Sequence, residues 1–267
     1  MVKYLATLIG AAALALGSAS AVSVAGEQRT HDTDLRAVLS AGSTLEVRGI
    51  LGSIVATAAQ GSAATIHAHA FSSQSDPAAV LIRATRLGRR LVVCAIYPGD
   101  PRTDCNDGDE RGDRDRKADG VAVDFTIAVP HDVKLLAQAV RGDVVATGLA
   151  GDISARVVEG DVRIATTGRA DARTVSGAID ATLGNTADGD DLEFETVSGP
   201  IHLTLPHGTN ASISARTLSG PIEADGGISL AVHDGEWVGH SATVKLGSGG
   251  LHISLHTVSG SIRVSQS

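Results

Sequence analysis

The chain has 267 residues, of which 43% are hydrophobic but only 2% aromatic, and a formal net charge of −8. This length suffices for one large domain or two smaller ones, and the scarcity of aromatic residues favours a narrow core of Val, Ile, Leu and Ala. The negative charge, with no basic stripe that also carries aromatic residues, argues against a nucleic-acid-binding protein.

Residues 1–25 have the pattern of a secretory signal peptide. Lys3 supplies a positive start, residues 5–16 are an apolar run too short to span a bilayer, and small residues follow, so cleavage is expected near Ala21 or Ala25. No later stretch has the length and hydropathy of a transmembrane segment. The mature chain is therefore expected in the periplasm, secreted or at the cell envelope, with residues 26–44 as a polar lead-in.

Residues 45–55 have the features of a degenerate first repeat, and residues 64–71 alternate apolar and polar side chains as a strand does. His67 and His69 lie on one face of that strand, about 7 Å apart at their Cα atoms. Two imidazoles on one face could begin a metal site, but the sequence offers no evident third ligand. We therefore expect two surface histidines, with no metal and no cofactor.

Asp76 and Pro77 are followed by residues that fit either a short helix or a strand, and both alternatives stay open. Cys94 and Cys105 are expected to form a disulfide in an oxidising compartment, worth roughly 3 kcal/mol. The disulfide would tether a charged loop inserted at residues 99–120. Clustered carboxylates there raise the question of Ca²⁺, but interleaved arginines compete for them, so a solvated loop is expected.

A phrase of the type Thr-Val-Ser-Gly-x-Ile recurs through the second half of the chain. Its glycines are Gly142, Gly160, Gly177, Gly199, Gly220 and Gly260. A period near twenty, with apolar and polar residues alternating inside each copy, indicates stacked coils built of strands. We predict an all-β, single-domain parallel β-solenoid over residues 45–267, with coils of about 17–22 residues and a second insertion at residues 225–250.

The glycine of each copy is expected at a tight corner, which either needs a positive φ or brings the next coil too close for a Cβ. Thr196 and Val197 are both expected to face inward, with a corner or a bulge between them. By the same reasoning Val175, Val197 and Leu218 should stack inside the core.

The residue directly after the Ile or Val of each copy should point outward. These residues are Val145, Arg163, Asp180, His202, Glu223 and Arg263. Neighbours in this column would lie side by side, and Arg163 next to Asp180 would be a favourable pair. The column is expected to be a solvated face with weak ion pairs.

Four segments, residues 94–98, 123–130, 191–199 and 257–262, resemble the bacterial putative-adhesin family, a domain of unknown function. The resemblance covers about residues 45–264. Members often carry Asn before the repeat glycine, where this chain has Ser176, Ser198, Ser219 and Ser259. The resemblance implies an exported β-solenoid at the cell envelope and brings no catalytic residues with it.

Three functions fit these observations. The leading hypothesis is a non-enzymatic envelope protein, an adhesin or interaction scaffold that binds an envelope protein or a glycan. The first alternative is a polysaccharide-acting enzyme, in which Asp143 and Asp161 occupy equivalent positions of neighbouring copies; the scarcity of aromatic residues for binding sugars argues against it. The second alternative is end-to-end self-association, through an open edge of the last strand, which ends at Val264.

Overall fold

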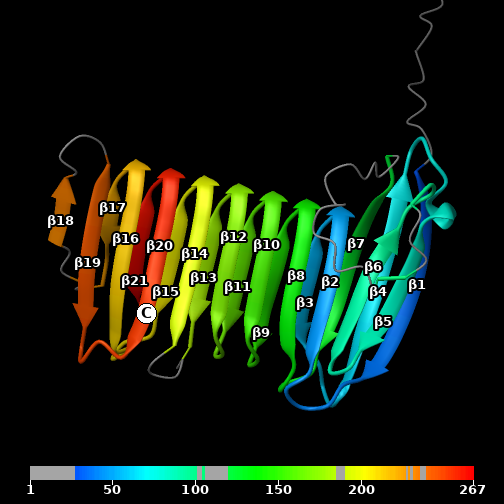
Figure 1. Cartoon of the computed structure of the whole chain (residues 1–267), viewed down its shortest axis with the longest axis horizontal. Helices are drawn as coiled ribbons and strands as arrows, with labels where there is room; N and C mark the ends of the chain where they lie inside the picture. Colours follow the sequence, from blue (N-terminus) through cyan, green and yellow to red (C-terminus); the bar gives the residue numbers. More distant parts are fainter. Residues whose placement is uncertain are drawn as a thin grey trace, which may run out of the picture.

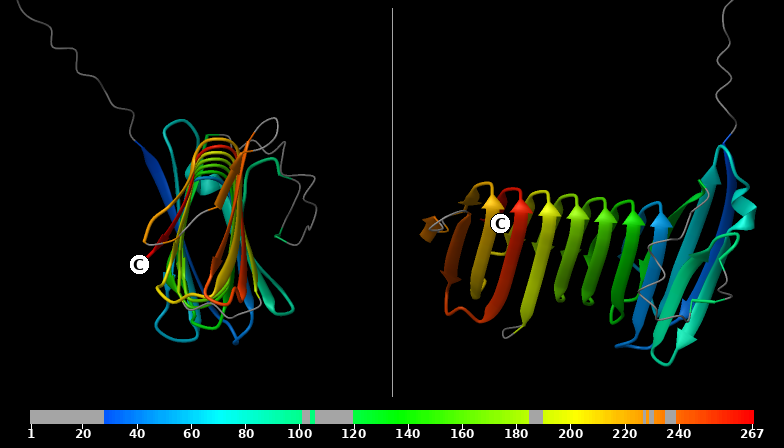
Figure 2. Two further views of the ribbon diagram at one scale, coloured as in Figure 1. Left: turned by 90° about the vertical axis from the view of Figure 1, so that its left-hand side faces the viewer. Right: turned by 45° about the horizontal axis from the view of Figure 1, so that its top comes forward.

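The structure is a computed structural model, and it describes residues 28–100, 104–105, 120–184, 190–226, 228, 231–234 and 239–267. The expected signal peptide and most of the charged loop 99–120, with most of its candidate calcium ligands, lie outside the described residues. Figure 1 shows a row of strands stacked side by side, and Figure 2 shows that they form two facing sheets joined along one side by tight corners.

The described strands belong to a ten-stranded sheet A and an eleven-stranded sheet B. In spatial order, sheet A contains β1 (Arg29–Val38), β4 (Ala63–Ser72), β7 (Ala122–Val129), β3 (Ile54–Ala58), β9 (Val144–Leu149), β11 (Val162–Thr166), β13 (Ile179–Leu183), β15 (Ile201–Leu205), β21 (Ile262–Gln266) and β17 (Ile222–Ala224). Sheet B contains β18 (Ala231–Asp234), β19 (His240–Leu246), β16 (Ala211–Ser219), β20 (Leu251–Ser259), β14 (Asp191–Ser198), β12 (Ala170–Ser176), β10 (Ile153–Glu159), β8 (Lys134–Arg141), β2 (Thr44–Leu51), β6 (Arg90–Ile96) and β5 (Leu81–Leu87).

Each central coil contributes one strand to each sheet and pairs in parallel with the coils on either side. The pairing is in register, so that Ile179 of β13 lies beside Val162 on one side and Ile201 on the other. In sheet B, Thr196 of β14 lies between Thr174 and Thr257 in the same way. The predicted parallel β-solenoid is therefore confirmed.

The coils do not all stack in the order of the sequence. The last coil, β20–β21, lies between the coils β14–β15 and β16–β17, which precede it in the chain. The coil β2–β3 is likewise placed between β6 and β8 in sheet B and between β7 and β9 in sheet A. The open edge expected on the last strand is therefore wrong, because β21 has a neighbour on both sides.

Antiparallel strands flank the parallel stack at both ends. At one end β1 pairs with β4, β4 with β7, and β5 with β6. At the other end β19 pairs with β16 and β18 with β19, so that the expected insertion at 225–250 supplies strands to sheet B. Residues 29–38, expected in a polar lead-in, form the ten-residue strand β1 because β4 offers them an unpaired edge.

The interior between the sheets consists of small aliphatic side chains. The core of described residues is Val, Ile, Leu and Ala almost throughout, with Phe125 and Phe194 fully buried among them.

The ambiguous segment after Asp76 contains both alternatives, a 3₁₀ turn η1 (Pro77–Ala79) capped by the Asp76 side chain and then strand β5.

The inward placement predicted for both Thr196 and Val197 is wrong. Thr196 is buried, whereas Val197 is 44% exposed, because β14 keeps its alternation through Val197 and turns only at Gly199. Val175, Val197 and Leu218 do belong to one column of in-register strands, but on the outside of sheet B. The core is supplied instead by residues such as Phe194, Ile201 and Leu203.

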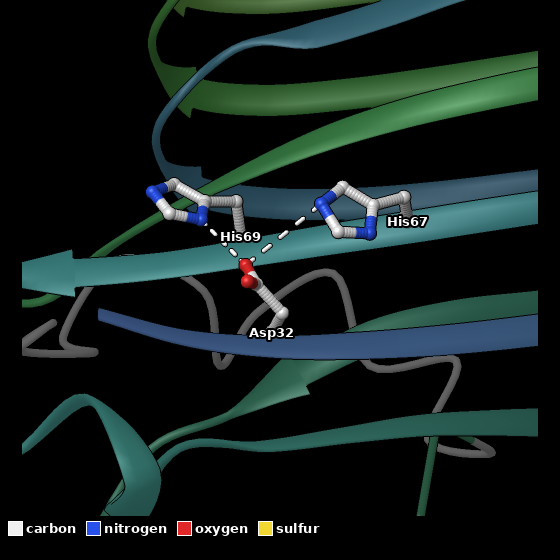
Figure 3. A group of neighbouring side chains, drawn as sticks. All are labelled: Asp32, His67 and His69. Carbon is white, nitrogen blue, oxygen red and sulfur yellow. Dashed lines mark hydrogen bonds and ion pairs between the residues drawn. The ribbon is translucent and has the colours of Figure 1, made fainter.

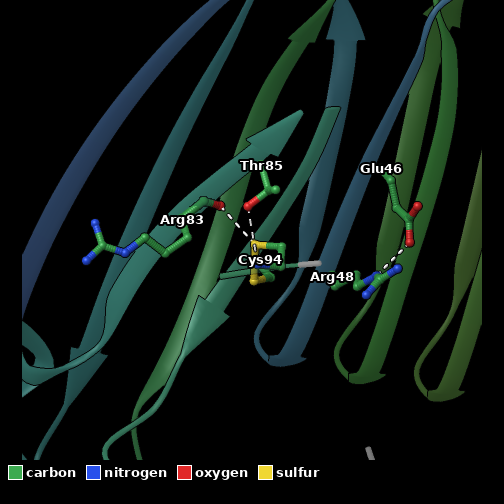
Figure 4. The surroundings of a disulfide bond; sticks show 6 residues. Glu46, Arg48, Arg83, Thr85 and Cys94 are labelled. Atoms are coloured by element: carbon green, nitrogen blue, oxygen red, sulfur yellow. Dashed lines mark hydrogen bonds and ion pairs between the residues drawn. A yellow bond between two sulfur atoms is a disulfide. The ribbon is translucent and has the colours of Figure 1, made fainter. Parts of the chain in front are cut away.

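Cys94 and Cys105 form the expected disulfide, with 5.8 Å between their Cα atoms. Figure 4 shows it against β6, where the bond and Cys105 make a second small apolar cluster with Val92 and Ile96. This cluster covers the outer face of β6, which is why β6 is buried on both faces. The disulfide thus holds a piece of the 99–120 loop on sheet B.

Candidate functional site

The corner glycines stack directly on one another. The amide of Gly177 donates to the carbonyl of Ser198, and that of Gly199 to the carbonyl of Ser259. A Cβ built on Gly199 would lie 2.0 Å from the carbonyl oxygen of Gly177, and φ there is +152°. Both reasons given for glycine at this corner, a positive φ and a close approach of the next coil, therefore apply.

In the four copies that contain a threonine, its hydroxyl satisfies the carbonyl of a corner glycine in the neighbouring coil. Thr196 is fully buried and its hydroxyl donates to the carbonyl oxygen of Gly177 at 3.1 Å. The same bond joins Thr174 to Gly160, Thr257 to Gly199 and Thr217 to Gly260. A buried hydroxyl is stable here because it has a partner, so the Thr of the repeat has a structural role.

The aspartates of the corners also bind backbone groups. Oδ1 of Asp143 accepts the amide of Asp161 at 2.9 Å, and Oδ1 of Asp161 accepts the amide of Ala178 at 2.7 Å. Asp124 does the same for the amide of Ser53 at 2.8 Å. Asp143 and Asp161, the carboxylates considered for polysaccharide chemistry, are thus neighbours, but each holds the backbone of the next coil.

A ladder of aliphatic side chains runs along the outer face of sheet B. Each strand contributes one of them, two residues before the corner glycine. In spatial order the ladder is Val140, Val158, Val175, Val197, Val258 and Leu218, of which Val140 and Val258 are half-buried. Val158, Val175, Val197 and Leu218 are 44, 48, 44 and 51% exposed. At about 4.8 Å per strand the aliphatic ladder is about 24 Å long, and such a continuous apolar line on a surface is typical of a binding site.

Cationic side chains accompany the aliphatic ladder. Two residues before the ladder on the same strands, and on the same face, are Arg156, Arg173 and Arg216. Arg173 pairs with Glu193 and Glu195, whereas Arg156 and Arg216 make no ion pair with any described residue. The ladder therefore offers methyl groups together with two unpaired guanidinium groups.

A shallow hollow of about 510 Å³ lies further along the same face, over β12, β14, β20 and β16. Its lining includes the carboxylates Asp171, Asp191 and Glu193 and the small side chains Ser214 and Ser254. Burial raises the pKa of the Asp171 carboxyl above its ordinary value, although Oδ1 accepts the Glu193 amide at 3.2 Å. The hollow is a depression lined by charged, small polar and aliphatic side chains, and it contains one carboxyl with an altered pKa.

The outward column of sheet A carries alternating charges. Arg163 lies 3.4 Å from Asp180, as predicted, and Asp180 also contacts Nδ1 of His202 at 2.9 Å. Next in the column, Arg263 pairs with Glu223 from the displaced coil. These side chains are one-third to two-thirds exposed, so each pair contributes little to stability and the column is a solvated face.

At the β1 end of sheet A, the structure brings a carboxylate to the two histidines of β4. Oδ1 of Asp32 lies 2.5 Å from Nδ1 of His69 and 3.8 Å from Nε2 of His67 (Figure 3). Nδ1 of His67 is bonded to Asp34 at 2.8 Å. The hydrogen bond with His69, and then the charges of the neighbouring histidines, hold the pKa of Asp32 below its ordinary value.

Comparison with protein families matches residues 132–265, just over half of the chain, to the family described as Toastrack DUF4097. The chain belongs to the Toastrack DUF4097 family. The matched residues of this Toastrack chain are the coils from β8 to β21, which include the whole aliphatic ladder and the whole hollow.

Two solved structures are similar to this Toastrack chain. A putative cell adhesion protein from Clostridium sporogenes is 11% identical, with a TM-score of 0.45 over 89% of this chain and 100% of that one. A putative adhesin from Bacteroides fragilis is 11% identical, with a TM-score of 0.35 over 89% of this chain and 97% of that one. A comparison with curated proteins found no match.

Sequence reasoning located part of what the Toastrack fold displays. It singled out His67 and His69 but missed Asp32, because pairing between β1 and β4 joins residues 37 positions apart. It missed the aliphatic ladder because it placed Val197 inside. The signal that could have corrected this is the strict alternation of residues 192–197, which puts Thr196 and not Val197 on the side of Phe194.

Proposed function

We propose that this chain is a non-enzymatic, exported envelope protein whose rigid solenoid binds a protein partner along the aliphatic ladder of sheet B. The ladder itself is the observation that supports the proposal most. Six successive coils carry an aliphatic side chain at the same outward position, and four of these side chains are more than 40% exposed, where a purely solvated sheet would carry polar residues. Export agrees with the disulfide, which forms and persists in oxidising compartments.

The chemistry of the ladder and of the arginines beside it indicates which class of partner would bind. Aliphatic side chains beside the unpaired Arg156 and Arg216 favour a polypeptide surface that presents apolar and acidic side chains. A glycan is a poorer fit because sugars are usually held against aromatic faces, and the ladder contains none. Among the described residues, no helix has the length and hydropathy needed to cross a bilayer.

The experiment compares the mature chain with a triple variant, Val175→Thr, Val197→Thr and Leu218→Thr, in binding to the envelope fraction of the organism that encodes it. Threonine favours strands as valine does, so the fold should persist. Losing the methyl groups should lower affinity more than ten-fold, since each buried methyl is worth about 0.8 kcal/mol. Val55→Thr is the matched control, because Val55 is 37% exposed but lies on sheet A.

Each outcome of this experiment supports or refutes the ladder as the site that binds a protein partner. Binding that is weakened in the triple variant, retained in Val55→Thr and abolished by protease treatment of the envelope fraction supports a protein partner at the ladder. Unchanged binding of the triple variant would refute the ladder as the site. Binding that survives the protease would favour a glycan, and a ladder-dependent dimer in sedimentation velocity would favour self-association.

A second candidate function, cleavage of a polysaccharide, is favoured by one observation. The hollow on sheet B combines Asp171, whose pKa burial raises, with Asp191 and Glu193, and a pair of carboxyl groups is what glycoside hydrolysis needs. Product release from a panel of acidic and neutral polysaccharides, lost in Asp171→Asn, would establish this candidate over the first. No release from any of them would remove it.

A further inference from the structure

The cluster of Asp32, His67 and His69 lies on the outer face of sheet A, far from the aliphatic ladder. One ligand atom from each of the three side chains lies within 4.8 Å of the other two. In Figure 3 both imidazoles extend from β4 towards the carboxylate of β1. The arrangement follows from the register, because His69 pairs with Asp32 and His67 with Asp34 across the two strands.

The hydrogen bonds of the cluster determine which ring nitrogen of His67 carries the proton. A carboxylate can only accept, so the 2.8 Å contact with Asp34 places the proton of a neutral His67 on Nδ1. Nε2 of His67 then carries a lone pair and faces Oδ1 of Asp32 at 3.8 Å. Nε2 of His67 and Oδ1 of Asp32 thus face each other with lone pairs and no proton between them, as two ligands of one cation would. A histidine whose other ring nitrogen donates to a carboxylate is also a common second-shell pattern at metal sites.

A second Asp–His pair on the same sheet shows what is particular to this cluster. Asp180 and His202 have nearly the same contact, 2.9 Å between Oδ1 and Nδ1. The third side chain there is Arg163, a permanent cation 3.4 Å from Asp180. Asp32 faces a second imidazole instead. The pair at Asp180 is therefore neutralised within the chain, whereas the cluster at Asp32 has room for an added positive charge.

We propose that Asp32, His67 and His69 bind a divalent transition-metal ion of the zinc class, with Asp34 orienting His67. Two imidazole nitrogens and one carboxylate oxygen are a ligand set that Zn²⁺ accepts, with water in the remaining position. Metal–ligand bonds of about 2.1 Å place tetrahedral ligand atoms about 3.4 Å apart. The three ligand atoms already lie within 4.8 Å of one another, so small side-chain rotations bring them to that spacing. The proton that Nδ1 of a neutral His69 donates to Asp32 moves to Nε2 when the ion takes its place.

The bound ion would join the outermost strand of sheet A to its neighbour. Among described strands, β1 pairs with β4 alone, and its outward residues are exposed. An ion held by Asp32 on β1 and by both histidines on β4 would cross-link the two strands. Metal binding would then stabilise the folded chain by mass action, because the site exists only where β1 is docked.

The test uses the mature chain without an affinity tag, after removal of metals with a chelator. Isothermal titration with Zn²⁺ at pH 7.5 should give one site per chain, and Zn²⁺ should slow hydrogen exchange of the β1 amides. Asp32→Asn, His67→Gln and His69→Gln should each lower the affinity at least ten-fold. Asp34→Asn should lower it about ten-fold, the usual effect of losing an orienting carboxylate. His202→Gln, the matched control, should leave the affinity unchanged.

The asparagine and glutamine variants keep polar side chains of similar size, and identical melting in the presence of chelator confirms that they fold. The proposal is overturned if the wild type binds no more Zn²⁺ than the double variant His67→Gln, His69→Gln. It is also overturned if His202→Gln loses as much affinity as His69→Gln, since the binding would then be dispersed over surface histidines. Binding without slower exchange in β1 would refute the cross-link between the strands.

Discussion

Gly199 shows how one residue type can satisfy two constraints at a corner. Its φ of +152° is strained for any residue with a side chain, and the carbonyl oxygen of Gly177 occupies the place of its missing Cβ. Gly208 has a positive φ of +81° as well, but no atom lies within 4 Å of where its Cβ would be. Comparing the two positions separates the backbone constraint from the contact between coils.

We predict that Gly199→Ala destabilises the chain by at least about 3 kcal/mol, the sum of backbone strain and a clash that only a shift of the neighbouring coil relieves. Gly208→Ala, with strain alone, should cost about 1–2 kcal/mol. Urea unfolding at equilibrium measures both. Equal costs at the two positions would mean that the coils are not in contact at Gly199.

Tyr97, at the end of β6, gives a residue-scale prediction about pH. Burial raises its pKa from 10.0 to about 12, and among the described residues its buried hydroxyl has no hydrogen-bond partner. Because the folded-state pKa lies above the unfolded one, this contribution to stability is complete below pH 10 and is lost as the pH rises from 10 towards 12. The free energy of unfolding should therefore fall by about 1.4 kcal/mol more in wild type than in Tyr97→Phe between pH 9 and pH 11. Denaturant unfolding of both chains at the two pH values tests this, and parallel losses would contradict it.

At the scale of elements, the two displaced coils are the main feature of the fold. The coil β20–β21 follows β16–β17 in the chain but lies between that coil and β14–β15. The chain therefore finishes inside the stack, and the three-residue strand β17 occupies the edge of sheet A. A buried final coil leaves a short edge, which gives other chains little backbone to pair with.

Hydrogen exchange should reveal this order of coils directly. Amides of β21 bond to neighbours within the stack, so we expect them to exchange as slowly as those of β13. Amides of β17, at the edge, should exchange much faster. If β21 exchanged as fast as β17, the last coil would be at the end of the stack, as the order of the sequence alone suggests.

How far the sequence predicts this fold depends on the range of the interactions. The spacing of the glycines and the alternation of apolar and polar residues around Val197 predict the coil, its corner and the parallel stacking, because these features repeat locally in the sequence. The repeat does not predict which coil lies beside which, since copies with the same pattern can pair with one another in any order. The contact of Asp32 with His69 depends on long-range pairing, so the third donor of the metal cluster was beyond sequence reasoning.

At the scale of the whole molecule, the solenoid has two unlike faces. The central coils of sheet A carry compensated charges such as Arg163 and Asp180, whereas sheet B presents the aliphatic ladder and the hollow. Backbone pairing and stacked corners fix the spacing of both faces, so that a partner meets a preformed line of methyl groups and little ordering entropy opposes binding. The proposed metal cluster lies apart from both, at the end of sheet A where β1 is docked.

The claim that the aliphatic ladder is the binding surface is tested most directly by methyl NMR. Chains with labelled valine and leucine methyl groups would be titrated with the protein components of the envelope fraction. The account predicts that the signals of Val158, Val175, Val197 and Leu218 shift or broaden first, while those of Val55 on sheet A stay unchanged. Binding that perturbs Val55 and leaves the ladder signals unaltered would contradict it.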